Sequence, residues 1–138
     1  MIDSTMILKD AGLVAASAAG TVATAAKIVN VGSGLVEGLL VVDVSAIEVA
    51  SNDELYSIAL QGSDVADFST GDEVIVELAV LNLGATEVIG GTADSAVGRY
   101  TVPFRNEYLG TIYPYVRVYT TVAGDVATGI NFKAHIQA

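Results

Sequence analysis

Residues 129–137 alternate between apolar and polar side chains without interruption, and this pattern constrains the fold more than any other part of the chain. The apolar members are Ile130, Phe132, Ala134 and Ile136, and the polar members are Asn131, Lys133, His135 and Gln137. Successive side chains of a β-strand point to opposite faces of its sheet. The alternation therefore predicts a strand with one face in a hydrophobic core and the other face outside it.

Six further apolar runs are separated by clusters of Gly, Asp, Asn and Ser, which favour turns. These predicted strands span residues 27–31, 38–46, 54–61, 73–83, 98–104 and 113–122. No long amphipathic helix separates them, so antiparallel pairing is expected instead of parallel strands with helical crossovers. The long connection at residues 84–97 favours a jelly-roll or Greek-key path. The predicted fold class is all-β, a jelly-roll-like antiparallel β-sandwich.

The N-terminal stretch differs from the rest of the chain, because residues 12–26 are rich in Ala, Ser, Thr and Gly and show no core pattern. Gly12, Gly20 and the repeated Thr and Val residues oppose a helix. We interpret the stretch as an extended arm or an irregular strand, with ordering on the surface of a partner as the functional alternative. The predicted organisation is an N-terminal arm, residues 1–26, followed by one β-sandwich domain, residues 27–138.

The inventory of reactive side chains is small: the chain has no cysteine and a single histidine, His135. A histidine base requires a nucleophile and an orienting acid, and no local pattern around His135 supplies them. The metal enzymes that share this sandwich architecture, of the cupin type, need several histidine ligands. We therefore interpret His135 as a solvated or interface residue, and we predict a protein that binds, with neither enzymatic activity nor a cofactor.

The formal net charge is −10, from six basic and sixteen acidic residues. Nucleic acids are bound mainly through cationic side chains that neutralise phosphates, so a nucleic-acid partner is not expected. An anionic membrane is disfavoured for the same reason. Asp3, Lys9 and Asp10 interrupt the N-terminus, so no cleaved signal peptide is expected either. The lack of cysteine suits synthesis in a reducing cytoplasm.

The loop at residues 64–73 gathers four carboxylates, from Asp64, Asp67, Asp72 and Glu73. Calcium prefers oxygen ligands, and an acidic loop can supply several of them. The loop lacks the alternating spacing and the distal Glu of an EF-hand. We interpret it as a solvated turn, with a calcium site as the alternative.

The stretch 108–119, with the sequence YLGTIYPYVRVY, holds four of the six tyrosines. In a strand over residues 113–122, Tyr113, Tyr115, Arg117 and Tyr119 would share one face, and Val116, Val118 and Val122 the other. Tyr and Arg are enriched at the energetic centres of protein interfaces. Tyrosine is also common on the outer faces of sheets, so a partner interface and a plain sheet surface both remain open.

With these residues in view, the chain resembles the Bordetella-phage type of capsid cement protein of tailed bacteriophages. The matching pieces are MILKDAG, LQGSDVADFS, VPFRNEYLGTIYPYVRVYTTVAGD and TGINFKAHI. They occur in the same order along nearly the whole chain, with residues 74–95 the least distinctive part. The resemblance is specific because of that order and because of the Tyr-Pro-Tyr-Val-Arg piece.

The resemblance implies a non-enzymatic jelly roll that decorates the outer surface of the icosahedral head and bridges neighbouring major capsid protein subunits. It also implies a homo-oligomer, with a dimer favoured over a trimer. For the contacts with the shell we select Tyr113, Tyr115, Arg117 and Tyr119, together with Met6 and Leu8 of the N-terminal arm. The alternative function is a carbohydrate-binding sandwich on a virion or cell surface, which a glycan array would separate from capsid binding.

Overall fold

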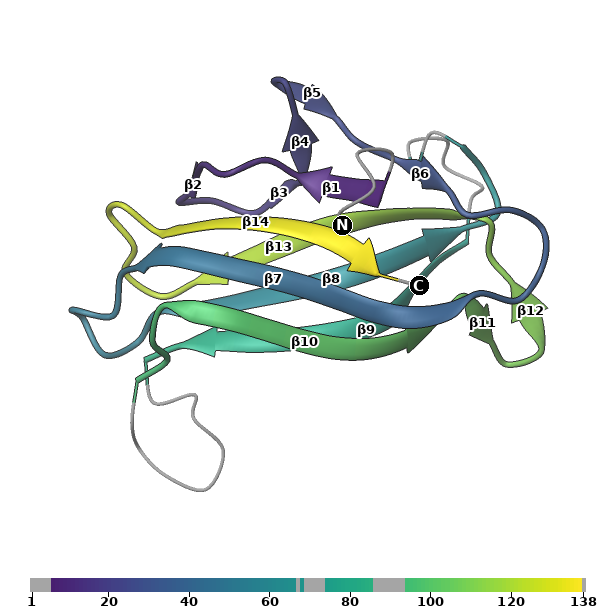
Figure 1. Ribbon diagram of the computed structural model, residues 1–138. Coiled ribbons are helices and arrows are strands. Elements are labelled where there is room, and N and C mark those ends of the chain that lie inside the picture. The colour runs from purple at the N-terminus through teal and green to yellow at the C-terminus, as the bar shows by residue number, and fades with distance from the viewer. Residues whose placement is uncertain (1–5, 67, 69–73, 86–93, 138) are drawn as a thin grey trace.

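The computed structural model describes residues 6–66, 68, 74–85 and 94–137, and within these ranges the chain forms β-strands and no α-helix (Figure 1). Two antiparallel sheets pack face to face around one hydrophobic core. The predicted all-β antiparallel sandwich is confirmed. No helix long and apolar enough to cross a membrane occurs in these ranges.

The strands differ greatly in length, and the six longest form the body of the sandwich. The short strands are β1 (Ile7–Lys9), β2 (Leu13–Val14), β3 (Ala18–Ala19), β4 (Thr21–Val22), β5 (Ala25–Ala26), β6 (Val29–Asn30), β11 (Glu107–Tyr108) and β12 (Thr111–Ile112). The long strands are β7 (Glu37–Ile47), β8 (Leu55–Ser63), β9 (Ile75–Gly84), β10 (Gly98–Arg105), β13 (Tyr115–Ala123) and β14 (Ile130–Gln137).

Eight of these strands follow a jelly-roll path. The first sheet has the order β1-β14-β7-β10, and the second sheet has the order β3-β13-β8-β9. The chain crosses from the first sheet to the second between β7 and β8 and returns between β9 and β10. It crosses again between β10 and β13 and returns between β13 and β14. Eight strands connected in this way form the double Greek key of a jelly roll. β2 and β6 add a fifth strand to the first and the second sheet by pairing with β14 and β13.

The long strands follow the alternation that was read from the sequence. On β8, Tyr56, Ile58 and Leu60 all point into the core and are completely buried. On β14, Phe132 and Ala134 are buried in the same core, as the alternation predicts. Burying apolar surface of this kind contributes about 25 cal/mol per Å², which makes these two faces the main source of stability.

The N-terminal segment lies along both sheets from residue 7 onward. β1 pairs with β14 in the first sheet, and β3 pairs with β13 in the second sheet. The segment is extended, as predicted, but it supplies the outermost strand of each sheet and so completes the jelly roll. Leu8 lies between the sheets with none of its surface exposed.

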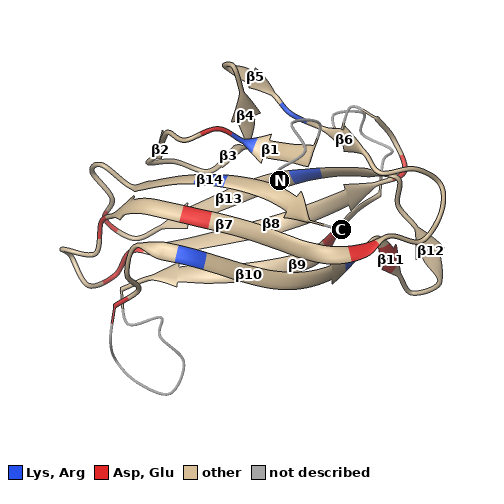
Figure 2. Cartoon of the chain, viewed as in Figure 1, with Lys and Arg blue, Asp and Glu red and all other residues tan. Residues whose placement is uncertain are grey.

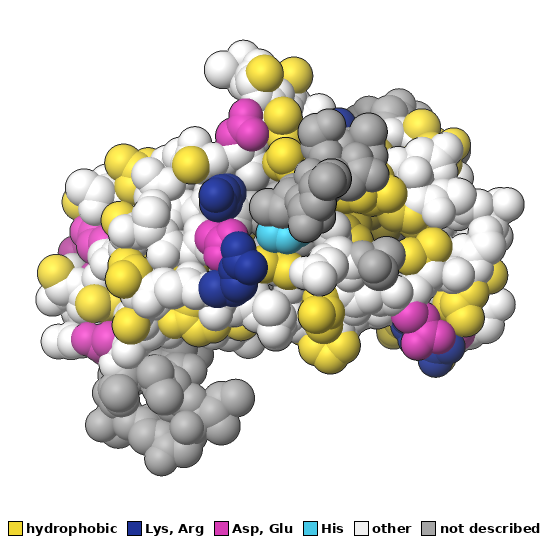
Figure 3. Space-filling view, viewed as in Figure 1, with side chains coloured by type: hydrophobic (Ala, Val, Ile, Leu, Met, Phe, Trp, Pro, Cys, Tyr) yellow, Lys and Arg dark blue, Asp and Glu magenta, His cyan; other side chains and the backbone are white. Residues whose placement is uncertain are grey.

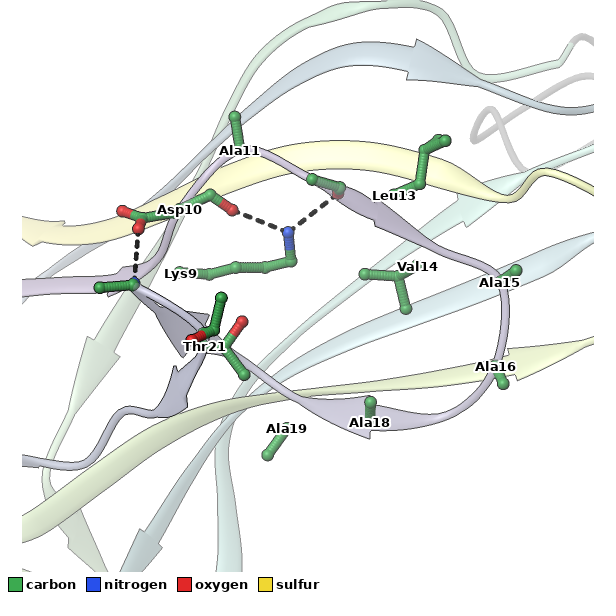
Figure 4. A pocket seen from close by; sticks show the side chains of 13 residues that line it. Lys9, Asp10, Ala11, Leu13, Val14, Ala15, Ala16, Ala18, Ala19 and Thr21 are labelled. Carbon is green, nitrogen blue, oxygen red and sulfur yellow. Dashed lines mark hydrogen bonds between the residues drawn. The ribbon is translucent and has the colours of Figure 1, made fainter.

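Lys9 fixes the beginning of this segment to β14. Its ammonium donates hydrogen bonds to the carbonyl oxygens of Asp10 (2.9 Å), Gly12 (3.0 Å) and Phe132 (2.8 Å), the first two of which are visible in Figure 4. Burial lowers the pKa of Lys9, while the neighbouring Asp10 carboxylate opposes that shift. An ammonium has three N–H donors, and these three hydrogen bonds use all of them. Beside Lys9, the N-terminal strands surround an open hollow of about 410 Å³, in which alanine is the most frequent lining residue (Figure 4).

Candidate interaction surface

The outer face of the second sheet carries a cross-strand row of small and aromatic side chains. The registers place Ala19, Tyr119, Ala59 and Val80 opposite one another on β3, β13, β8 and β9. Tyr119 is half-buried and Val80 is exposed, whereas Ala59 is covered. Tyr115 and Arg117 lie on the same face of β13. We call the outward surface of Tyr115, Arg117, Tyr119, Ala59 and Val80 the tyrosine face.

The Arg117 side chain is held in place by contacts with other residues of the same chain. Its guanidinium carbon lies 4.4 Å from the centre of the Phe68 ring and 5.3 Å from the centre of the Tyr119 ring. Its Nε also donates a 2.9 Å hydrogen bond to Oε1 of Gln61 on β8. Such cation–π contacts contribute roughly 0.5–2 kcal/mol each, more when water is excluded. Arg117 therefore orders this end of the tyrosine face and holds the buried Phe68 against it.

Tyr113 does not belong to the tyrosine face, which corrects the prediction that it shares a face with Tyr115. It precedes β13 and is only 6% exposed, and its amide donates a 2.7 Å hydrogen bond to the carbonyl of Asn106. β13 begins only at Tyr115, and Pro114, which has no N–H to donate to the ladder, lies between the strand and Tyr113. Tyr113 is therefore a packing residue of the loop before β13.

The two N-terminal residues selected as partner contacts lie at or near the core. Leu8 is completely buried, and Met6 is half-buried and packs against the core cluster. In this structure Leu8 has no surface to offer a partner. The short strand β1 turns Leu8 toward the core. The sequence of the N-terminal segment shows no core pattern and therefore did not predict this burial.

The acidic loop at 64–73 lies largely outside the described residues, as do three of its four carboxylates, those of Asp67, Asp72 and Glu73. Asp64 is exposed, and its Oδ1 accepts a 3.4 Å hydrogen bond from the amide of Val74. Within the described ranges no group of three or more His, Asp or Glu side chains could hold a metal ion. The calcium alternative stays a prediction.

Most of the charged side chains on the outer face of the first sheet lie in one row across the strands. The registers place Lys133, Asp43 and Arg99 opposite one another on β14, β7 and β10, and Figure 2 shows acidic and basic positions side by side on β7 and β10. The Asp43 carboxylate accepts two hydrogen bonds from Arg99, at 2.7 Å to Nε and 3.2 Å to Nη2. These bonds, with a contribution from Lys133, hold the pKa of Asp43 below its usual value.

His135 lies beside this row but is only 6% exposed, so its interpretation as a solvated residue is corrected. It stands opposite Ile7 on β1 and Val41 on β7, and these apolar neighbours cover the outer face at that point. Burial lowers the pKa of His135. The Asp43 carboxylate opposes the shift, and Arg99 and Lys133 add to it. Neutral imidazole is the form that this environment favours.

Acidification is expected to destabilise the fold through His135. Because its pKa is lower in the folded state than in the unfolded chain, both states are neutral above about pH 6.5 and the unfolded state takes up the proton first below it. Stability is therefore lost as the pH falls from about 6.5 toward the folded-state pKa. His135→Gln should flatten this part of the urea-midpoint profile between pH 7.5 and 5. An identical slope in both proteins would contradict this role for His135.

Two contacts on these faces were not found from the sequence. The Asp43–Arg99 pair joins strands 56 residues apart, and only the strand register could have brought the two charges together. The Phe68–Arg117 contact joins a loop to β13, and no sequence pattern marks it. Phe68 adopts a positive φ of 55°, which is uncommon for a bulky side chain and shows that its contacts hold it in place.

Comparison with known proteins adds no family to this description. Neither a protein-family model nor a curated protein matches the chain.

Proposed function

We propose that this protein is a capsid cement protein of a tailed bacteriophage, which binds the outer surface of the icosahedral head and bridges major capsid protein subunits. The proposal rests on the sequence resemblance along nearly the whole chain. The structural observation that carries it is the tyrosine face, where Tyr115 and Tyr119 lie half-exposed on the same sheet face as the exposed Val80. Rigid aromatic side chains of this kind are typical anchors of protein interfaces.

The mechanism is binding without chemistry. A protein that binds the assembled shell more tightly than its separate subunits shifts the equilibrium toward the shell. A standard specific interface buries about 1,600 Å² in total, which one sheet face and its surrounding loops can provide. A homo-oligomer, with a dimer ahead of a trimer, would engage several capsid subunits at once, and such linkage raises the overall affinity well above that of each contact.

The charge of the chain supports a place outside the shell. The net charge of −10 repels packaged DNA, whereas it does not oppose a protein partner that approaches a largely uncharged sheet face. Several basic side chains are engaged within the fold, among them Lys9 and Arg117. Synthesis in the host cytoplasm followed by addition to the head surface is the order of events that we propose.

Truncating the tyrosine face is expected to weaken head binding without unfolding the protein. Tyr115→Ala combined with Tyr119→Ala removes two half-exposed rings, and an interface anchor of this type contributes about 2 kcal/mol or more. The apparent affinity for mature heads should therefore fall about 30-fold or more. Cosedimentation with heads stripped of the protein measures occupancy, and thermal unfolding reports on the fold.

Tyr108→Ala is the matched control, because Tyr108 is 46% exposed but lies in the β11–β12 hairpin at one end of the molecule (Figure 1). Its occupancy on heads should equal that of the unmodified protein. If the double variant and the unmodified protein still occupied the heads equally when both were diluted tenfold, the tyrosine face would be rejected as the contact. Absence of binding by the unmodified protein to both mature heads and procapsids would reject the proposed function.

A further inference from the structure

The first sheet has an open hollow of about 420 Å³ on its outer face, on the side opposite the tyrosine face. Asp43, Arg99 and Lys133 line it, together with Ser45 and the backbone of Gly98. Figure 3 shows two basic side chains on either side of an acidic one near the centre of this face. The hollow is thus lined by a charged row that contains two cations and one anion.

Arg99 is oriented before any ligand arrives. Two of its nitrogens are bonded to the Asp43 carboxylate, which fixes the plane of the guanidinium. The Arg99 side chain nevertheless remains 59% exposed, whereas the Asp43 side chain is 20% exposed. The donors that Asp43 does not use are therefore accessible from solvent.

Lys133 supplies the second cation at the other end of the row. It is exposed on β14, directly across from Asp43. Within the part of the chain that the structure describes, its ammonium has no hydrogen bond and no ion pair. Asp43 is already neutralised by Arg99, so the row keeps one unit of positive charge, with free donors on two side chains.

Most of the remaining basic residues are occupied elsewhere in the fold. The Lys9 ammonium is enclosed by three carbonyls, and Arg117 is stacked against Phe68. Arg105 lies between Glu37 and Glu107, at 3.6 and 3.8 Å. In a chain of net charge −10, the row on the first sheet is therefore an exception, where an anionic group is attracted.

We propose that this hollow binds the carboxylate side chain of a protein partner, with Arg99 and Lys133 as the donors and Ser45 as a neighbouring hydroxyl. One excess positive charge matches one carboxylate, whereas a polyanion such as DNA would be repelled by the rest of the protein. Leu39, exposed on the same face of β7, would add an apolar contact typical of a protein interface. The inference rests on the proposed function in one respect, because it takes the partner to be a subunit of the phage shell, and a different one from the subunit that contacts the tyrosine face.

The binding chemistry is tested by NMR titration of the full ¹⁵N-labelled chain with a blocked tetrapeptide of one glutamate, one leucine and two glycines. This peptide offers one carboxylate to the hollow and one apolar side chain to Leu39. Sodium acetate at equal carboxylate concentration is the second arm, and all samples are matched in ionic strength with sodium chloride. We expect saturable shifts of the Ser45, Gly98 and Lys133 amides with the peptide and much weaker ones with acetate. Arg99→Gln combined with Lys133→Gln should weaken peptide binding about tenfold or more.

Lys27→Gln combined with Arg105→Gln is the matched control, since it also removes two positive charges, but from residues that do not line the hollow. It should bind the peptide as the unmodified protein does. If this control weakened peptide binding as much as the test variant does, net charge alone would explain the effect and the inference would be overturned. Equal binding of acetate and peptide would overturn the choice of a protein partner.

Cosedimentation with stripped heads then separates the inference from the proposed function. If the unmodified protein binds heads and the Arg99→Gln, Lys133→Gln variant binds them tenfold more weakly, the hollow contacts the shell. If both proteins bind heads equally, the inference fails while the proposed function stands. If the peptide binds in the hollow but the unmodified protein does not bind heads, the proposed function fails while the carboxylate site stands.

Discussion

Gly129→Ala is expected to destabilise the protein by roughly 2–5 kcal/mol, because two separate costs meet at this position. Gly129 has a φ of +85°, a left-handed conformation that costs an alanine about 1–2 kcal/mol. A Cβ at this position would also collide with the carbonyl oxygen and carbon of Val14 in β2. Overpacking of this kind costs typically 1–3 kcal/mol, and backbone atoms cannot move aside as a flexible side chain can.

The Gly129 amide also takes part in a local cap. Oε2 of Glu48 accepts hydrogen bonds from the amides of Thr128 (2.7 Å) and Gly129 (2.8 Å). The backbone donors, that of Gly129 first, hold the pKa of Glu48 below its usual value. Any shift of the backbone that relieves the clash with Val14 would therefore disturb this cap as well. Equilibrium urea unfolding at pH 7.5 measures the combined cost.

Gly110→Ala separates the two costs of the Gly129 substitution. Gly110 has nearly the same φ, +86°, but an added Cβ would meet no atom within 4 Å. It should lose only the conformational part, about 1–2 kcal/mol. If the two variants unfolded at the same urea concentration, the close approach between Gly129 and β2 would not exist in solution.

The long strands could be predicted from the sequence because their patterns are local. In β8 the alternation of Tyr56, Ile58 and Leu60 with smaller residues is complete, and each of the three is buried in the core. In β14 the same rule holds for Phe132 and Ala134. A period of two over eight or more residues leaves few other structures that can bury one face.

The strands of the N-terminal segment could not be predicted in the same way. β3 consists of Ala18 and Ala19, whose side chains carry no amphipathic pattern. It exists because backbone groups of β13 are available beside it, opposite Thr120 and Tyr119. A strand of two small residues is determined by its partner, which lies about a hundred residues away, and tertiary context outweighs propensity there.

The candidate interface could be predicted in part. Tyr115 and Tyr119 do lie on the outer face of β13, because both positions belong to a regular strand. Tyr113 was misplaced because Pro114 ends the alternation before it reaches that residue. The contact between Arg117 and Phe68 depends on how a loop folds back over the sheet, and a strand pattern contains no information about that path.

Leu8→Ala is expected to destabilise the protein by about 2–5 kcal/mol, which is the usual cost of removing a completely buried leucine from a core. The result decides between two descriptions of the N-terminal segment. In the structure Leu8 is a core residue held in place by β1 and by the neighbouring Lys9 ammonium. If the segment were an arm that becomes ordered only on a partner, truncating Leu8 would hardly change the stability of the free protein.

Leu13→Ala is the control for this prediction, because Leu13 belongs to the same segment and pairs with β14 but is 61% exposed. An exposed truncation of this kind normally changes stability by no more than about 0.5 kcal/mol. Urea unfolding of both variants in the absence of heads should therefore give a clear loss for Leu8→Ala and almost none for Leu13→Ala. Two equal, near-zero effects would show that β1 is detached in the free protein, and Leu8 would again be accessible to the shell.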